Sequence, residues 1–70
     1  MDWAGVLCGD YVMLAKEANV VGAFSLEKRQ FVAETSIGDF DPVSAYGTNT
    51  KFYLMDFSGK FKVIDVPGTK

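Results

Sequence analysis

The side chains that most often carry catalysis are scarce in this chain of 70 residues, which has no histidine and a single cysteine, Cys8. Without histidine, the chain lacks the commonest general base and the commonest metal ligand. Cys8 has no imidazole partner to activate it, so we expect it to pack as a small buried hydrophobe. The sequence therefore predicts no catalytic residue, no metal ligand and no cofactor, and a protein that is not an enzyme.

Two short patterns come closest to a chemical site. Residues 25–28, S-L-E-K, match the S-x-x-K string of serine acyl-enzymes, but the companion motifs of those enzymes are absent. Glu34, Asp39 and Asp41 could gather around a divalent cation, although two or three carboxylates are too few for a dedicated calcium loop. We give the first pattern no weight and interpret the three carboxylates as a solvated acidic loop.

A third pattern places lysines beside aromatic residues near the C-terminal end, as in proteins that stack bases on a sheet and hold phosphates with cations. The residues concerned are Lys51, Phe52, Tyr53, Phe57, Lys60, Phe61, Lys62 and Lys70. The chain as a whole has seven basic and nine acidic side chains, a net charge of −2. Because phosphate contacts normally dominate such affinity, single-stranded nucleic-acid binding by this segment is the alternative hypothesis, and we do not expect nucleic acid as the partner.

The element that positions these aromatic residues is a predicted β-hairpin over residues 51–66. Its loop, residues 56–60 (D-F-S-G-K), is typical of a type I turn followed by a glycine bulge. That loop sets Met55 opposite Phe61 and places the opposite charges of Lys51 and Asp65 across from each other. Alternation along the strands then gives two apolar faces. One face carries Tyr53, Met55, Phe61 and Val63, and the other carries Phe52, Leu54, Ile64 and Val66.

A hairpin in a small domain normally gives one face to water, and this one has no polar face to give. A domain of this length buries only about 60% of its unfolded surface, so added burial is valuable. We therefore expect one face to be core and the other to be a binding surface or a dimer interface. The pattern alone leaves open which face is which.

The remaining elements are predicted to be a helix, a second hairpin and a helical turn. Apolar residues at helical spacing predict a helix over residues 2–18, with the stripe Trp3, Leu7, Tyr11, Leu14 and Ala18. Two interior glycines leave a second possibility, a short strand over 3–8 followed by a helix over 11–18. Residues 20–26 and 30–35 read as an antiparallel pair whose inward, apolar face carries Phe24, Leu26, Phe31 and Ala33. A helix from residue 26 is the rival interpretation. Asp41-Pro42 and Gly47 are typical of the start and end of one helical turn.

These elements predict a single α+β domain, residues 1–70, with the N-terminal helix packed on a four-stranded antiparallel sheet of two hairpins and a short helical turn between them. The alternative is a small, partly closed barrel. The helix-then-hairpin order, notably residues 19–25 (N-V-V-G-A-F-S), loosely resembles roadblock/profilin-like domains over about half of the chain. Those domains have a full helix between the hairpins where this chain has about one turn, so we do not assign it to them.

The function that fits this pattern best is a non-enzymatic protein-interaction module, such as a small regulator, adaptor or phage-type inhibitor that masks a surface on a larger partner. We expect it to form a homodimer and to be cytoplasmic, since it has one cysteine, no long apolar run for a membrane span and no basic N-terminal region. The residues we assign to partner binding are Tyr53, Met55, Phe57, Phe61, Asp39, Phe40 and Asp41.

Overall fold

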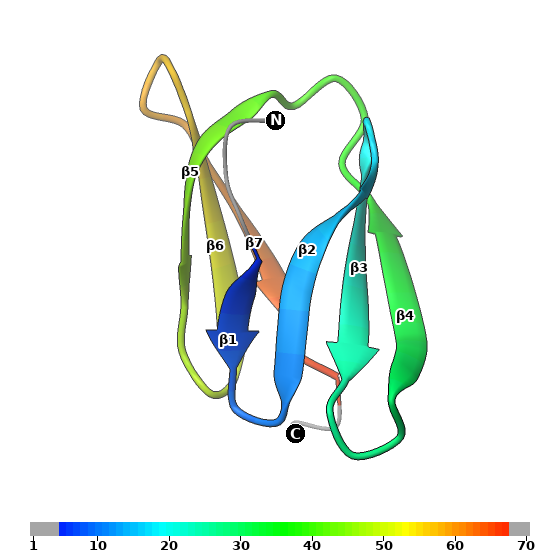
Figure 1. The fold of residues 1–70 in the computed structure, drawn as a ribbon. Helices are drawn as coiled ribbons and strands as arrows, with labels where there is room; N and C mark the ends of the chain where they lie inside the picture. The colour runs from blue at the N-terminus through cyan, green and yellow to red at the C-terminus, as the bar shows by residue number, and fades with distance from the viewer. Residues whose placement is uncertain (1–4, 68–70) are drawn as a thin grey trace.

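The computed structural model describes residues 5–67, and this part of the chain forms seven strands in two antiparallel sheets (Figure 1). The first sheet has the order β1-β2-β3-β4 and the second the order β5-β6-β7. The strands are β1 (Val6–Cys8), β2 (Tyr11–Glu17), β3 (Val20–Ser25), β4 (Gln30–Ser36), β5 (Pro42–Gly47), β6 (Lys51–Asp56) and β7 (Phe61–Asp65). The described residues contain no helix, so the predicted α+β fold is wrong and the fold is all-β.

The predicted N-terminal helix is replaced by the hairpin β1–β2, whose two-residue turn begins at Gly9. Gly9 has a φ of 60°, which glycine adopts without the steric cost that other residues bear. With Cys8 paired to Tyr11 across this turn, alternate residues such as Cys8 and Met13 point into the core. The helical stripe was therefore a coincidence of spacing between two strands. Trp3, which headed that stripe, lies outside the described residues.

The pairing of β3 with β4 confirms that these segments are antiparallel strands, but the predicted faces are wrong. Val21, Ala23 and Ser25 are buried, whereas Phe24 and Phe31 lie on the outer side. A β-bulge between Ala23 and Phe24 shifts the register.

The connection between β3 and β4 contains no glycine. Arg29 takes the left-handed conformation there, with a φ of 56°, and its N–H donates to the carbonyl of Ser25.

The short helical turn predicted over residues 41–47 is also wrong, because Pro42–Gly47 is the strand β5. Pro42 lacks an N–H and is tolerated in a strand at the edge of a sheet, which is the place of β5. Gly47 is not a helix stop but a point of close approach. A Cβ there would lie 2.3 Å from Cys8 Sγ and 2.8 Å from Val6 Cγ1. The absent side chain lets β5 pack directly against β1.

The hairpin β6–β7 has the register predicted from its loop. Lys51 pairs with Asp65, Tyr53 with Val63 and Met55 with Phe61. The turn is closed by hydrogen bonds from Gly59 N to Asp56 O and from Asp56 N to Lys60 O. Gly59 has a φ of 90°, as the glycine bulge requires.

The two sheets face each other around one core, and the structure settles which face of β6–β7 belongs to it. The buried apolar side chains come from both sheets: Cys8, Met13, Val21, Ala23, Ile37, Phe52, Leu54, Ile64 and Val66. β1 and β5 are in contact, but the two sheets are not joined by strand pairing. The resemblance to roadblock/profilin-like domains rested on a helix before the first hairpin, and a hairpin stands in its place.

Candidate interaction surface

The outer face of β5-β6-β7 carries six side chains that point away from the core, and we call it the aromatic face. Its members are Ser44, Tyr46, Tyr53, Met55, Phe61 and Val63. Tyr46 is 67% exposed, Phe61 68% and Val63 52%, while Tyr53 and Met55 are half-buried. Large apolar side chains that stay this exposed on one contiguous face are typical of interaction sites.

Strand pairing arranges the aromatic face in two cross-strand rows. One row is Ser44–Met55–Phe61 and the next is Tyr46–Tyr53–Val63. In the first row the small Ser44 lies on β5 and the large Phe61 lies on β7. In the second row the large Tyr46 lies on β5 and the smaller Val63 lies on β7. The rings of Tyr46 and Tyr53 are 6.3 Å apart between centroids and tilted by 36°. A shallow groove of about 200 Å³ runs between these rows.

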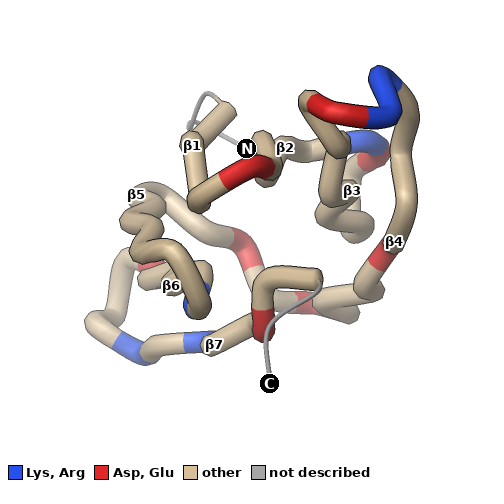
Figure 2. The backbone as a smooth tube through the Cα atoms, turned by 90° about the horizontal axis from the view of Figure 1, so that it is seen from below, with Lys and Arg blue, Asp and Glu red and all other residues tan. Residues whose placement is uncertain are grey.

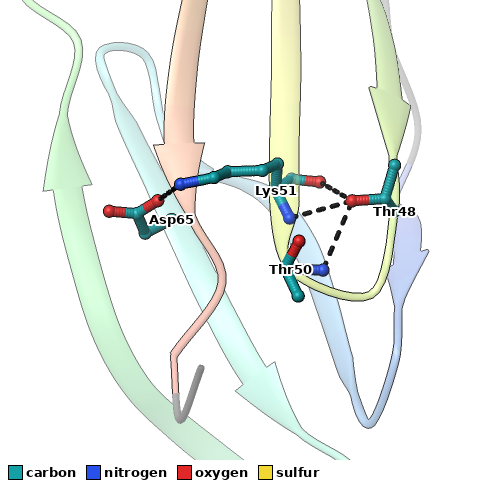
Figure 3. A network of polar contacts seen from close by, with 4 residues as sticks. All are labelled: Thr48, Thr50, Lys51 and Asp65. Carbon is teal, nitrogen blue, oxygen red and sulfur yellow. Dashed lines mark hydrogen bonds and ion pairs between the residues drawn. The ribbon is translucent and has the colours of Figure 1, made fainter. Parts of the chain in front are cut away.

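The end of the aromatic face near the β5–β6 turn is closed by a polar network (Figure 3). Thr48 Oγ1 accepts hydrogen bonds from the N–H groups of Lys51 (3.0 Å) and Thr50 (3.3 Å). Lys51 Nζ pairs with Asp65, and this hydrogen bond, followed by the charge of Asp65, raises the pKa of Lys51. Among residues 5–67, Lys51 is thus the lysine in line with the aromatic face, and its charge is balanced by Asp65 across the strands.

The opposite end of the aromatic face is the β6–β7 turn. Asp56 Oδ1 accepts hydrogen bonds from Ser58 N, Ser58 Oγ and Lys60 N. The bond from the Ser58 hydroxyl, supported by the two N–H donors, lowers the pKa of the Asp56 carboxyl. Phe57 stands at the tip of this rigid turn and is 94% exposed. Phe57 thus extends the exposed aromatic surface beyond the strands.

The remaining lysines of the hairpin do not line the aromatic face. Lys62 belongs to the opposite face of β7, where its Nζ lies 5.9 Å from the centroid of the Phe40 ring. Lys60 lies in the turn, where its N–H is bonded to Asp56. Figure 2 shows the basic positions divided between the β6–β7 hairpin and the β3–β4 side of the molecule. Among residues 5–67, no lysine or arginine combines with these aromatic residues into a basic aromatic surface.

The acidic loop between β4 and β5 was the second predicted contact region. Asp39 and Asp41 are exposed there. Phe40 is half-buried and packs against the core cluster, so its ring is not displayed beside the two carboxylates. The structure thus brings Tyr53, Met55 and Phe61 to one face and leaves Phe57 in the adjoining turn, while Asp39, Phe40 and Asp41 belong to neither cross-strand row.

Sequence reasoning missed Tyr46 and Ser44, because it placed them in a helical turn. The signal that could have found them is the alternation in residues 44–47, S-A-Y-G, in which small residues occupy the inward positions. Ala45 is half-buried against the core and Gly47 contacts β1. The alternating positions, Ser44 and Tyr46, are exposed.

The outer face of the first sheet is apolar too. Leu7 on β1 is 63% exposed there, whereas the aromatic rings of β3 and β4 pack onto their own strands. The Phe31 ring lies over Gly22, where a Cβ would be 2.7 Å from Phe31 Cε1, and it meets Phe24 edge-on at 5.3 Å. Lys16 Nζ lies 4.9 Å from the centroid of the Phe31 ring and pairs with Glu34. Phe31 is left 37% exposed, about half the exposure of Phe61. The aromatic face has no comparable cover among the described residues.

Cys8 is fully buried, as expected from the sequence, and burial raises the pKa of its thiol. Within residues 5–67, no group of three or more His, Cys, Asp or Glu side chains is placed to hold a metal ion. The same residues include no helix long and apolar enough to cross a membrane. Comparison with protein-family models, with curated proteins and with solved structures finds no match to this chain.

Proposed function

We propose that this chain is a non-enzymatic protein-interaction module that binds its partner through the aromatic face. The observation that carries the proposal is the exposure of Tyr46, Phe61 and Val63 on a sheet whose other face is core. At roughly 200 Å² for a whole aromatic side chain, the exposed parts of Tyr46 and Phe61 amount to about 270 Å². Aromatic residues are enriched at the centres of protein interfaces, where they contribute much of the binding energy. A regulator, adaptor or inhibitor that masks a surface on a larger protein would use such a face.

Single-stranded nucleic-acid binding is the second candidate, and the lysine positions count against it. Stacked bases need nearby cations to hold the phosphates. Lys51 is paired with Asp65 and Lys62 lies on the other face beside Phe40. A partner for the aromatic face would therefore be apolar and uncharged where it makes contact, which is the chemistry of a protein surface.

A photo-crosslinking experiment tests the proposal. A photoreactive benzoyl-phenylalanine replaces Phe61 in one sample and Leu26, an exposed residue of the β3–β4 turn, in the matched control. In extracts of cells that express the chain, we expect crosslinks to protein from position 61 only. The captured protein, identified by mass spectrometry and purified, should then bind the wild-type chain and the Leu26→Glu variant but not Phe61→Glu. Capture of nucleic acid, or equal capture from both positions, would reject the proposal.

A further inference from the structure

The partner that best fits the aromatic face is a second copy of this chain, and this inference rests on the proposed function. We infer that two copies pack their aromatic faces together about a two-fold axis that runs along β6. In such an isologous contact each residue meets its partner twice, once in each direction. Three features of the aromatic face support this contact: its two cross-strand rows, its charge and its size.

The rows make the aromatic face complementary to itself. A two-fold axis along β6 brings β5 of one copy over β7 of the other. Each cross-strand row then faces the same row of the second copy. Ser44 then lies over Phe61 of the second copy, and Tyr46 lies over the smaller Val63. At the ends of each row a large side chain meets a smaller one, as close packing of two sheet faces requires. In the middle of each row, Met55 and Tyr53 meet the same residue of the second copy. The half-buried side chains of β6, Tyr53 and Met55, lie along the axis.

The charges of the aromatic face allow this contact. The pair Lys51–Asp65 neutralises itself at the end of the face, and the two rows contain no charged residue. A second copy therefore brings no charge against the rows of the first. At the end of the axis the two Lys51 side chains face each other, each paired with its own Asp65. A strongly charged partner would find no charged group in the rows to pair with.

The size of the aromatic face sets the expected strength. Tyr46 and Phe61 together expose about 270 Å², against the roughly 800 Å² that each partner buries in a standard stable interface. The rest of the contact has to come from Val63, Ser44 and the half-buried residues of β6. We therefore expect a reversible dimer with a dissociation constant in the micromolar range.

Sedimentation-equilibrium ultracentrifugation of the purified chain, from one micromolar to one millimolar, tests the inference. We expect a monomer–dimer equilibrium that Phe61→Ser weakens at least tenfold, because the dimer loses two large side chains, one from each copy. Leu26→Ser, at an exposed site on the other sheet, should leave the dimer within about threefold of wild type. Unfolding of each variant at low concentration checks that the monomer is intact.

Ser44→Phe decides the register. The substitution adds apolar surface to the face, so it would strengthen a dimer held together only by nonspecific burial of apolar area. In the inferred dimer it sets two phenylalanines against each other, and we expect at least tenfold weaker association. The double variant Ser44→Phe/Phe61→Ser mirrors the row about Met55 and should restore the dimer to within about threefold of wild type. Strengthening by Ser44→Phe alone would overturn the inferred packing.

Crosslinking of the purified chain supplies an independent measurement. A benzoyl-phenylalanine at position 61 should give a covalent dimer whose attachment site lies in β5 of the other copy, and attachment within β7 would contradict the axis. A wild-type chain that stays monomeric up to one millimolar overturns self-association. If position 61 nevertheless captures a different protein in extracts, the proposed function stands and only the self-association is wrong. If position 61 captures nothing in either setting, both are wrong.

Discussion

The contact between Gly47 and Cys8 makes the sharpest prediction about the fold. In Gly47→Ala the new Cβ would lie 2.3 Å from Cys8 Sγ and 2.8 Å from Val6 Cγ1, far inside ordinary contact distance. Cys8 is fully buried in the core and Val6 packs against it, so neither side chain can give way without disturbing its neighbours. Overpacking of this kind costs about 1–3 kcal/mol. In a domain whose total stability is on the order of 5 kcal/mol, this is a large fraction.

Thermal and urea unfolding, followed by circular dichroism, measure the loss. A cost of about 2 kcal/mol corresponds to a fall in Tm of roughly 8–16 °C for a domain of this size. The Cys8→Ala background separates this contact from other effects, since it removes the sulfur that the new Cβ meets. There we expect Gly47→Ala to cost at least ~1 kcal/mol less than in wild type, a coupling typical of residues in contact. A loss below about 0.5 kcal/mol in wild type, or an equal loss in both backgrounds, would refute the close packing of β1 on β5.

Three further predictions follow from the turn, the buried thiol and the lysines. The Asp56 carboxyl has its pKa lowered below the ordinary 3.8, so its stabilisation is complete above that value and is lost as pH falls through the lower pKa of the folded state. The difference in Tm between wild type and Asp56→Ala should therefore be largest near neutral pH and shrink below about pH 4; a constant difference from pH 7 to pH 2 would contradict the hydrogen bonds from Ser58 and Lys60. Cys8 should react with iodoacetamide only as fast as the chain unfolds, because the thiol is buried and its pKa is raised; rapid labelling of the folded protein would count against that burial. Fluorescence anisotropy with labelled oligonucleotides should show no binding at physiological salt, and micromolar binding that falls steeply with salt and disappears in Lys60→Glu/Lys62→Glu would favour the nucleic-acid hypothesis.

The parts of the fold that could be predicted from the sequence are those in which particular residue types specify the turn between two strands. The loop D-F-S-G-K, residues 56–60, contains an aspartate that can accept backbone hydrogen bonds and a glycine that can take positive φ. These two residues fix the loop length, and the loop length fixes the register of β6 on β7. The turn between β3 and β4 has no such signal, because Arg29 takes the left-handed conformation. The strands there were predictable, but the bulge at Ala23 and the resulting faces were not.

The N-terminal segment and β5 were mispredicted because local pattern and tertiary packing disagree there. Apolar residues in two short strands on either side of a turn happened to fall at helical spacing, and only the two interior glycines, Gly5 and Gly9, argued against a helix. Asp41-Pro42 has the residue types of a helix start, but Pro42 is equally suited to a sheet edge. A close approach such as that of Gly47 to Cys8 depends on where β1 lies, which no local pattern in residues 42–47 reveals.

The strand register also explains why the Phe31 ring packs onto its own sheet while Tyr46 and Phe61 stay exposed. On the first sheet, Gly22 leaves room for the Phe31 ring to lie flat on the strands, where Phe24 and Lys16 hold it. The rows of the aromatic face contain no glycine on which a ring could lie in this way. Tyr46 and Phe61 therefore remain largely exposed, and their area stays available to a partner. Whether a large ring packs onto its own sheet thus depends on the presence or absence of a Cβ beside it, and the sequence shows which residue lies beside the ring only once the strand register is known.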